Sequence, residues 1–113
     1  MPITNPTMMK HAFLTEMYDD DYFPDFLVDK CKQILFSLCE QIESSKPADT
    51  VSLFKLTHAA VETINQLESE FEANDSEIET GARDALGDEF HAILQAYGFV
   101  DADVEDAIAN RDW

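Results

Sequence analysis

Four side chains have the types and spacings that a metal centre between helices needs. His58 precedes Glu62 by four residues and Asp88 precedes His91 by three, so each pair shares one face if its segment is helical. Di-metal helical bundles use repeated Glu-x-x-His motifs, which this sequence lacks. Because the apolar pattern leaves all four residues on polar faces, a solvated face is the preferred interpretation. A small metal- or ligand-binding enzyme that uses these four residues is the alternative hypothesis.

No other grouping supports catalysis. A nucleophile, a base and an oxyanion donor cannot be assembled, and no glycine-rich phosphate loop occurs. Cys31 and Cys39 lie eight residues apart, which on one helix is about 12 Å of rise and too far for a disulfide, so we expect two free thiols in or near the core. His11 has no acid at helical spacing and is expected at the surface. We predict no catalytic residue, no cofactor and no metal ligand.

One stretch of the sequence is exceptionally acidic. An electronegative surface of this kind either aids solubility or attracts a basic protein and speeds its association. We predict a non-catalytic interaction protein that binds a basic protein partner through this surface, as an inhibitor, an immunity protein or a regulator. The acidic face, six acids within twelve residues, consists of Glu68, Glu70, Glu72, Asp75, Glu77 and Glu79.

The net charge limits the partners. The 113 residues include 24 Asp and Glu against 7 Lys and Arg, a net charge of −17, whereas phosphate binding needs clustered cations. We therefore expect no direct nucleic-acid binding and no anionic membrane surface as a partner. The sequence has no apolar run long enough to span a bilayer and no signal-peptide pattern at its start, so a cytoplasmic location is expected.

Three consecutive acids at 19–21 lack the spacing of a calcium-binding loop. They are better explained as the residues that precede a helix N-terminus, whose positive end favours negative charge.

Apolar residues recur at helical rather than strand spacing throughout. A first helix is predicted over residues 8–18, capped by Thr7, with Met9, Phe13 and Met17 on its apolar face. A second is predicted from Pro24 to about residue 46. A third is predicted from residue 49 or 50, with an apolar face of Leu53, Leu56, Ala60, Ile64, Leu67 and Phe71.

The fourth helix is predicted to start at a capping box formed by Ser76 and Glu79 and to end at Gly98. Gly87 leaves open whether it is one helix or two. A short last helix is predicted over residues 103–110. The whole chain, residues 1–113, is thus predicted to be a single all-α domain, a compact bundle of four to five helices with short loops.

Four aromatic residues decide whether the sequence indicates an interface with a partner or with a second copy of the chain. Trp113 is expected to dock into the bundle, although a role as a partner anchor is the other interpretation. Phe26, Phe36 and Phe54 lie outside the main apolar lines and could form a homodimer seam, so both a monomer and a homodimer remain open.

Several segments resemble an uncharacterised bacterial family of short acidic helical proteins, described only as a domain of unknown function. The resemblance covers nearly the whole chain, which implies a complete protein, and it brings no assigned catalytic residue. The segments that carry it are Met17-Tyr18-Asp19-Asp20-Asp21-Tyr22-Phe23-Pro24, Leu56-Thr57-His58-Ala59-Ala60, Ser76-Glu77-Ile78-Glu79-Thr80 with Ala82-Arg83, Tyr97-Gly98-Phe99 and Arg111-Asp112-Trp113.

Overall fold

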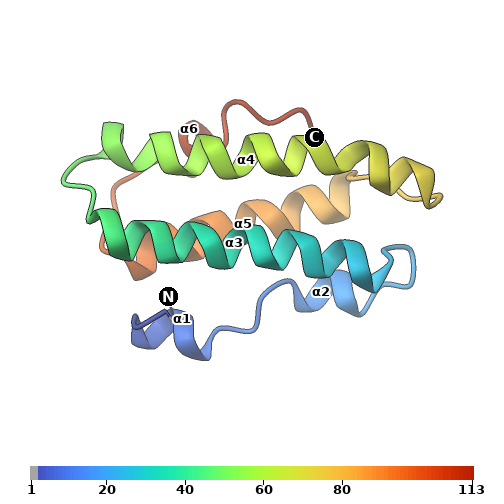
Figure 1. Cartoon of the computed structure of the whole chain (residues 1–113), viewed down its shortest axis with the longest axis horizontal. Helices are drawn as coiled ribbons and strands as arrows, with labels where there is room; N and C mark the ends of the chain where they lie inside the picture. Colours follow the sequence, from blue (N-terminus) through green and yellow to red (C-terminus); the bar gives the residue numbers. More distant parts are fainter. Residues whose placement is uncertain (1–2) are drawn as a thin grey trace.

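Three long amphipathic helices form the framework, because their apolar faces are buried in one shared core. They are α3 (Asp25–Ser45), α4 (Thr50–Ala73) and α5 (Thr80–Ala96). In the computed structural model, which describes residues 3–113, α3 and α4 lie side by side and α5 lies behind them (Figure 1). Residues 1 and 2, which the predicted domain includes, lie outside the described residues.

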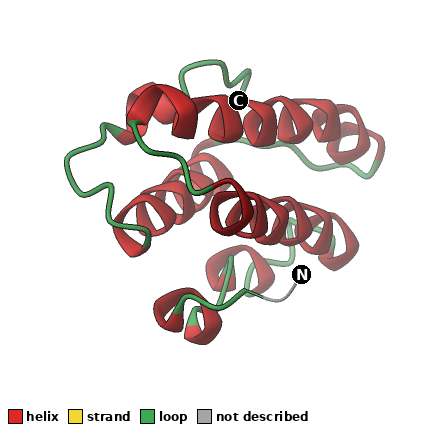
Figure 2. Cartoon of the chain, turned by 60° about the vertical axis from the view of Figure 1, so that its left-hand side comes forward, coloured by secondary structure: helices red, strands yellow, loops and turns green. Residues whose placement is uncertain are grey.

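Three short helices complete the chain. They are α1 (Pro6–Lys10), α2 (Thr15–Tyr18) and α6 (Val104–Ala107). Helix α1 packs against α5 and α2 packs against α5 and α3, whereas α6 with the residues after it runs over α4 (Figure 1). Helices and loops account for all of residues 3–113 (Figure 2), so the predicted all-α class and bundle architecture are confirmed.

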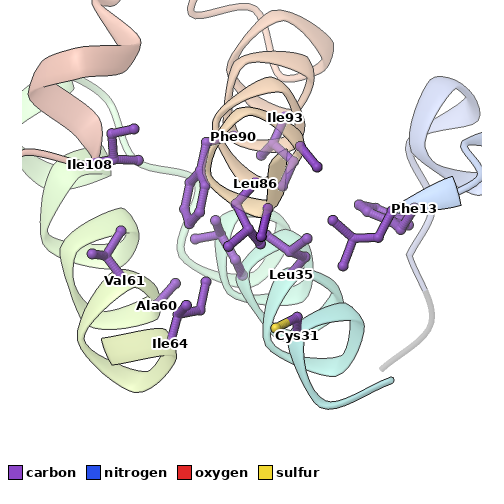
Figure 3. Packing of buried hydrophobic residues seen from close by; sticks show 14 of the residues in the cluster. Phe13, Cys31, Leu35, Ala60, Val61, Ile64, Leu86, Phe90, Ile93 and Ile108 are labelled. Atoms are coloured by element: carbon purple, nitrogen blue, oxygen red, sulfur yellow. The ribbon is translucent and has the colours of Figure 1, made fainter. Parts of the chain in front are cut away.

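The core lies where the three long helices meet. In Figure 3, Leu86 and Phe90 of α5 project into the space between α3 and α4, toward Leu35 and Ile64. All four side chains are fully buried, as is Phe71 near the end of α4. Burying each contributes about 1.5–3 kcal/mol relative to exposure, so this interior holds the framework together without a disulfide. Cys31 and Cys39 are buried and free, as expected, and burial raises the pKa of each thiol to about 12.

The first predicted helix is wrong, because the chain breaks it in two. Residues 11–14 separate α1 from α2, and Leu14 adopts a left-handed conformation with φ 58° while its side chain is buried. The cap is Asn5 rather than Thr7, since Asn5 Oδ1 accepts the backbone N–H groups of Thr7 and Met8 at 2.9 and 3.1 Å. Because of this break, the buried face of α1 differs from the predicted one: Met8 is buried and Met9 is 66% exposed.

The ends of α5 and α6 also differ in part from expectation. The Ser76 capping box does not form; Ser76 is buried in the loop and Glu79 stands at the N-cap of α5. The helix then continues unbroken through Gly87. It ends in a Schellman motif with Gly98 at φ 87°, as predicted, because glycine enters this region at little cost. Helix α6 is shorter than the predicted 103–110.

The apolar face predicted for the third helix is confirmed in α4, where only Leu56 is half-buried. The three phenylalanines suggested for a dimer seam differ in exposure. Phe36 and Phe54 are half-buried and pack against the core, whereas Phe26 is 49% exposed.

None of the helices within residues 3–113 combines the length and the apolar character needed to cross a membrane.

Lys46 at the end of α3 offers a test of this architecture. It occupies the left-handed region at φ 49° and ψ 61°, where a side chain costs about 1 kcal/mol and glycine does not. We expect Lys46→Gly to be about 1 kcal/mol more stable than Lys46→Ala, a control that removes the same charge. Urea unfolding monitored by circular dichroism measures the difference. Equal stability of the two variants would contradict the left-handed cap.

Candidate functional site

Carboxylates from three separate segments meet in one cleft, which we call the acidic cleft. Glu68 and Glu72 come from one face of α4, Glu77 from the loop before α5, and Asp112 from the C-terminal segment. The cleft has a volume of about 240 Å³. Its remaining lining residues are Ile78, Arg83 and Trp113. Three acids of the predicted acidic face are thus brought together, and the structure adds a fourth, Asp112, that the sequence did not indicate.

Asn65 of α4 holds the C-terminal segment in place beside the cleft. Its side-chain amide donates to the carbonyl of Asn110 at 3.1 Å, and its Oδ1 accepts the backbone N–H of Asp112 at 2.9 Å. An amide side chain can satisfy a donor and an acceptor of an extended segment at once. The position of Asp112 in the cleft therefore depends on Asn65, a residue that sequence reasoning missed because a lone asparagine on a helix has no distinctive signal.

His58 has a structural role in the same attachment. Its Nε2 donates to the carbonyl of Asp106 at 2.9 Å, and the side chain of Asn110 donates to the carbonyl of His58 at 2.9 Å. Its ring also stacks on Phe54 with the centroids 6.0 Å apart. The polar side of α4, which the sequence analysis predicted to be solvated, instead forms hydrogen bonds with α6 and the segment after it.

Trp113 docks into the molecule, as expected. It is only 7% exposed, and the guanidinium group of Arg111 lies over its ring at 6.0 Å from the centroid. Arg111 also pairs with Glu105 at 3.3 Å. Trp113 therefore forms an apolar wall of the acidic cleft rather than an exposed anchor.

The surroundings of Glu68 in the cleft disfavour its ionised form. Partial burial, and then the nearby charges of Asp112 and Glu72, raise the pKa of Glu68 above its usual value. A raised carboxyl pKa means that the ionised form is stabilised less here than in water. Arg83 is the single cation among the lining residues, so the cleft as a whole favours an incoming positive charge.

The other three acids of the predicted face lie outside the cleft lining. Glu70 pairs with Lys30 of α3 at 2.5 Å. Asp75 forms the left-handed turn after α4 at φ 59°, and Glu79 stands at the start of α5. The six acids of the acidic face are therefore close in sequence but do not form one surface. Three line the cleft, and the other three belong to an ion pair, a turn and a helix start.

The four residues of the metal hypothesis are not brought together. His58 is bound to backbone, Glu62 is exposed on α4, and Asp88 and His91 line a different cleft along α5. Within residues 3–113 no group of three or more His, Cys, Asp or Glu side chains is arranged to hold a metal ion.

Two polar clusters were not foreseen. His11, expected at the surface, is half-buried and its Nε2 donates to the carboxylate of the buried Glu89 at 2.9 Å. This expectation was wrong because the partner lies 78 residues away along the chain, beyond any local spacing rule. The pair attaches the segment between α1 and α2 to α5.

Glu43 forms the second cluster. It accepts hydrogen bonds from the backbone N–H and hydroxyl of Thr4 at 2.8 and 2.7 Å, from the N–H of Asn5 at 3.2 Å, and from the hydroxyl of Tyr97 at 2.5 Å. Desolvation would raise the pKa of this carboxyl, but the hydrogen bonds outweigh it and lower the pKa to about 2. Glu43 thus joins the N-terminal segment to α3 and to the end of α5.

Comparison with known proteins agrees with the resemblance seen in the sequence. The model of a family of unknown function, DUF5713, matches residues 7–113. The chain belongs to this family. No curated protein matches the chain significantly, and no solved structure does so either.

Asn65 provides a test of how the cleft is assembled. Asn65→Ala removes both hydrogen bonds to the C-terminal segment, and we expect it to lower the free energy of unfolding by about 1–3 kcal/mol. Trp113 is the only tryptophan of the chain, so its fluorescence reports docking directly and should shift to the red. Gln66→Ala on the exposed side of α4 is the control. An unchanged emission maximum in Asn65→Ala would show that the segment docks without this clamp.

Glu68 provides a pH test of the crowded carboxylates. Because its folded-state pKa is raised, its contribution to stability is greatest below its unfolded pKa of about 4.3 and is lost as the pH rises through the folded value. We expect Glu68→Gln to be more stable than the wild type at about pH 7, with the difference shrinking toward about pH 4. Urea midpoints across this range measure it, with Glu62→Gln as the exposed control. A gain that does not depend on pH would contradict the electrostatic cause.

Proposed function

We propose that this protein is a non-catalytic binding module whose acidic cleft receives a lysine or arginine side chain of a basic protein. One observation carries the proposal: four carboxylates from three segments converge on a cleft that contains a single guanidinium group. Acids that serve only solubility gain nothing from such convergence, because like charges destabilise one another. A bound cation would relieve this repulsion.

The walls of the cleft suit the stem of such a side chain. Ile78 and Trp113 are both buried nine-tenths or more and line the cleft beside its carboxylates. Lysine and arginine place their methylene groups along apolar surface while the charged end reaches a carboxylate. The combination of an aromatic wall with an acidic rim therefore recognises a long basic side chain better than a small cation.

The charge of the whole protein supports the same role. A net charge of −17 attracts a basic protein over distance and raises the association rate, with a strong dependence on salt. An inhibitor, immunity or regulatory role would use this fast association. The two buried, free thiols fit a reducing compartment, so we propose a cytoplasmic location, and bacterial origin is part of the same proposal.

Two triple variants with equal charge changes test the proposal. The first, Glu68→Gln with Glu72→Gln and Glu77→Gln, neutralises the cleft. The second, Glu62→Gln with Asp19→Asn and Asp101→Asn, neutralises three exposed acids elsewhere. Wild type and both variants are immobilised, exposed to a lysate of the native host and eluted with a salt gradient, and bound proteins are quantified by mass spectrometry.

We expect a basic protein that the wild type and the scattered variant retain and that the cleft variant loses. The affinity of that purified partner for the cleft variant should fall by about tenfold or more, because each neutralised contact removes a charge-assisted interaction. Equal loss in both variants would show that only the overall charge matters. Retention by all three proteins would exclude the cleft as the binding site.

A further inference from the structure

A second cleft lies between α5 and the segment that contains α6, and its lining carries both signs of charge. It has a volume of about 430 Å³. Both arginines of the chain, Arg83 and Arg111, line it, as do the carboxylates of Asp84 and Asp88. In a chain so poor in cations, the convergence of both arginines on one cleft is the first observation that points to a ligand.

Several of these charged groups are uncommitted. Within residues 3–113 the side chains of Arg83, Asp84 and Asp88 make no hydrogen bond or ion pair. Arg111, by contrast, is held by Glu105 and by the carbonyl of Ile108. The free polar groups of the lining within residues 3–113 are therefore one guanidinium, two carboxylates and the imidazole of His91, all carried by α5.

The floor of the cleft contains a glycine for which the chain shows no packing reason. Gly87 lies in the middle of α5, where glycine is less stable than alanine. A Cβ atom built on it would meet nothing within 4 Å, and no unusual backbone angle requires glycine there. A glycine at such a position permits close approach of an external group to the backbone.

We propose that this mixed-charge cleft binds a small zwitterion, a molecule with both a carboxylate and an ammonium group. Arg83 presents a planar pair of donors that matches a carboxylate, and Asp84 and Asp88 accept from the ammonium group. Gly87 leaves room for the body of the ligand between them. A simple anion would be repelled by the two aspartates, and a diamine would leave Arg83 without a partner. The ligand chemistry fits a free amino acid or the C-terminal lysine of a peptide, in which the side chain supplies the ammonium group.

Nuclear magnetic resonance titrations at constant ionic strength test the proposal. L-lysine is the main probe, because it offers a carboxylate with ammonium groups at two distances. Nα-acetyl-L-lysine mimics a C-terminal lysine residue and distinguishes that source from a free amino acid. Cadaverine has the ammonium groups without the carboxylate. We expect saturable amide shifts confined to residues 83–91 and 104–111 with L-lysine or Nα-acetyl-L-lysine, and at least about tenfold weaker binding of cadaverine.

Two glycines provide matched variants. Gly81 also lies on α5 with open space around its Cβ position, but it does not line the cleft. Gly81→Ala and Gly87→Ala should both raise the midpoint of thermal unfolding. A loss of binding in either variant therefore could not be attributed to misfolding. We expect only Gly87→Ala to weaken binding of the preferred lysine probe, by about fivefold or more.

Arg83→Gln completes the design. It should weaken the preferred lysine probe by about tenfold without weakening cadaverine, because the carboxylate contact is lost while the removed positive charge only repelled the diammonium ion. The proposal is overturned if neither lysine probe gives saturable shifts, if cadaverine binds as well as they do, or if the shifts spread over acidic surfaces away from the cleft. It is equally overturned if Gly87→Ala binds the probe as tightly as Gly81→Ala.

Discussion

Carboxylates so outnumber cations in this chain that few of them form an ion pair. There are 24 Asp and Glu against 7 Lys and Arg, and within residues 3–113 only two ion pairs join a carboxylate to Lys or Arg. Neutral donors bind several of the other carboxylates. Glu43 accepts from Thr4 and Tyr97, and Asp49 and Asp103 accept backbone N–H groups at the starts of α4 and α6. The acids thereby fix helix ends and attach peripheral segments to the apolar core.

The acidic cleft differs from these satisfied carboxylates. Glu68 and Glu72 lie on one face of α4, and the C-terminal segment brings Asp112 toward them. Within the described residues no hydrogen bond compensates this approach as the hydroxyl of Tyr97 compensates Glu43. Hydrogen bonds lower the pKa of Glu43, whereas partial burial and then the charges of Asp112 and Glu72 raise the pKa of Glu68. The same residue type therefore stabilises the fold at one site and carries a charge that its surroundings disfavour at another.

The sequence revealed the features that depend on local periodicity. The apolar face of α4, its start at residue 49 or 50 and the Gly98 turn all follow from residues a few positions apart, and the structure has them. The break at Leu14 was not predictable in this way, because a buried leucine in a left-handed conformation is favoured only by its tertiary surroundings. The part played by Asp112 in the cleft was hidden for the same reason, since it depends on Asn65, 47 residues away.

The C-terminal segment links the two clefts. Arg111 lines the mixed-charge cleft and the next residue, Asp112, lines the acidic cleft, while Arg83 of α5 lines both. The side chain of Asn65 binds the backbone of Asn110 and of Asp112, on either side of Arg111, so this attachment helps to position a wall of each cleft. A ligand that engages Arg83 from one cleft withdraws it from the other, and the acidic cleft then loses its only lining cation. Occupancy of the two clefts should therefore be coupled through this guanidinium group.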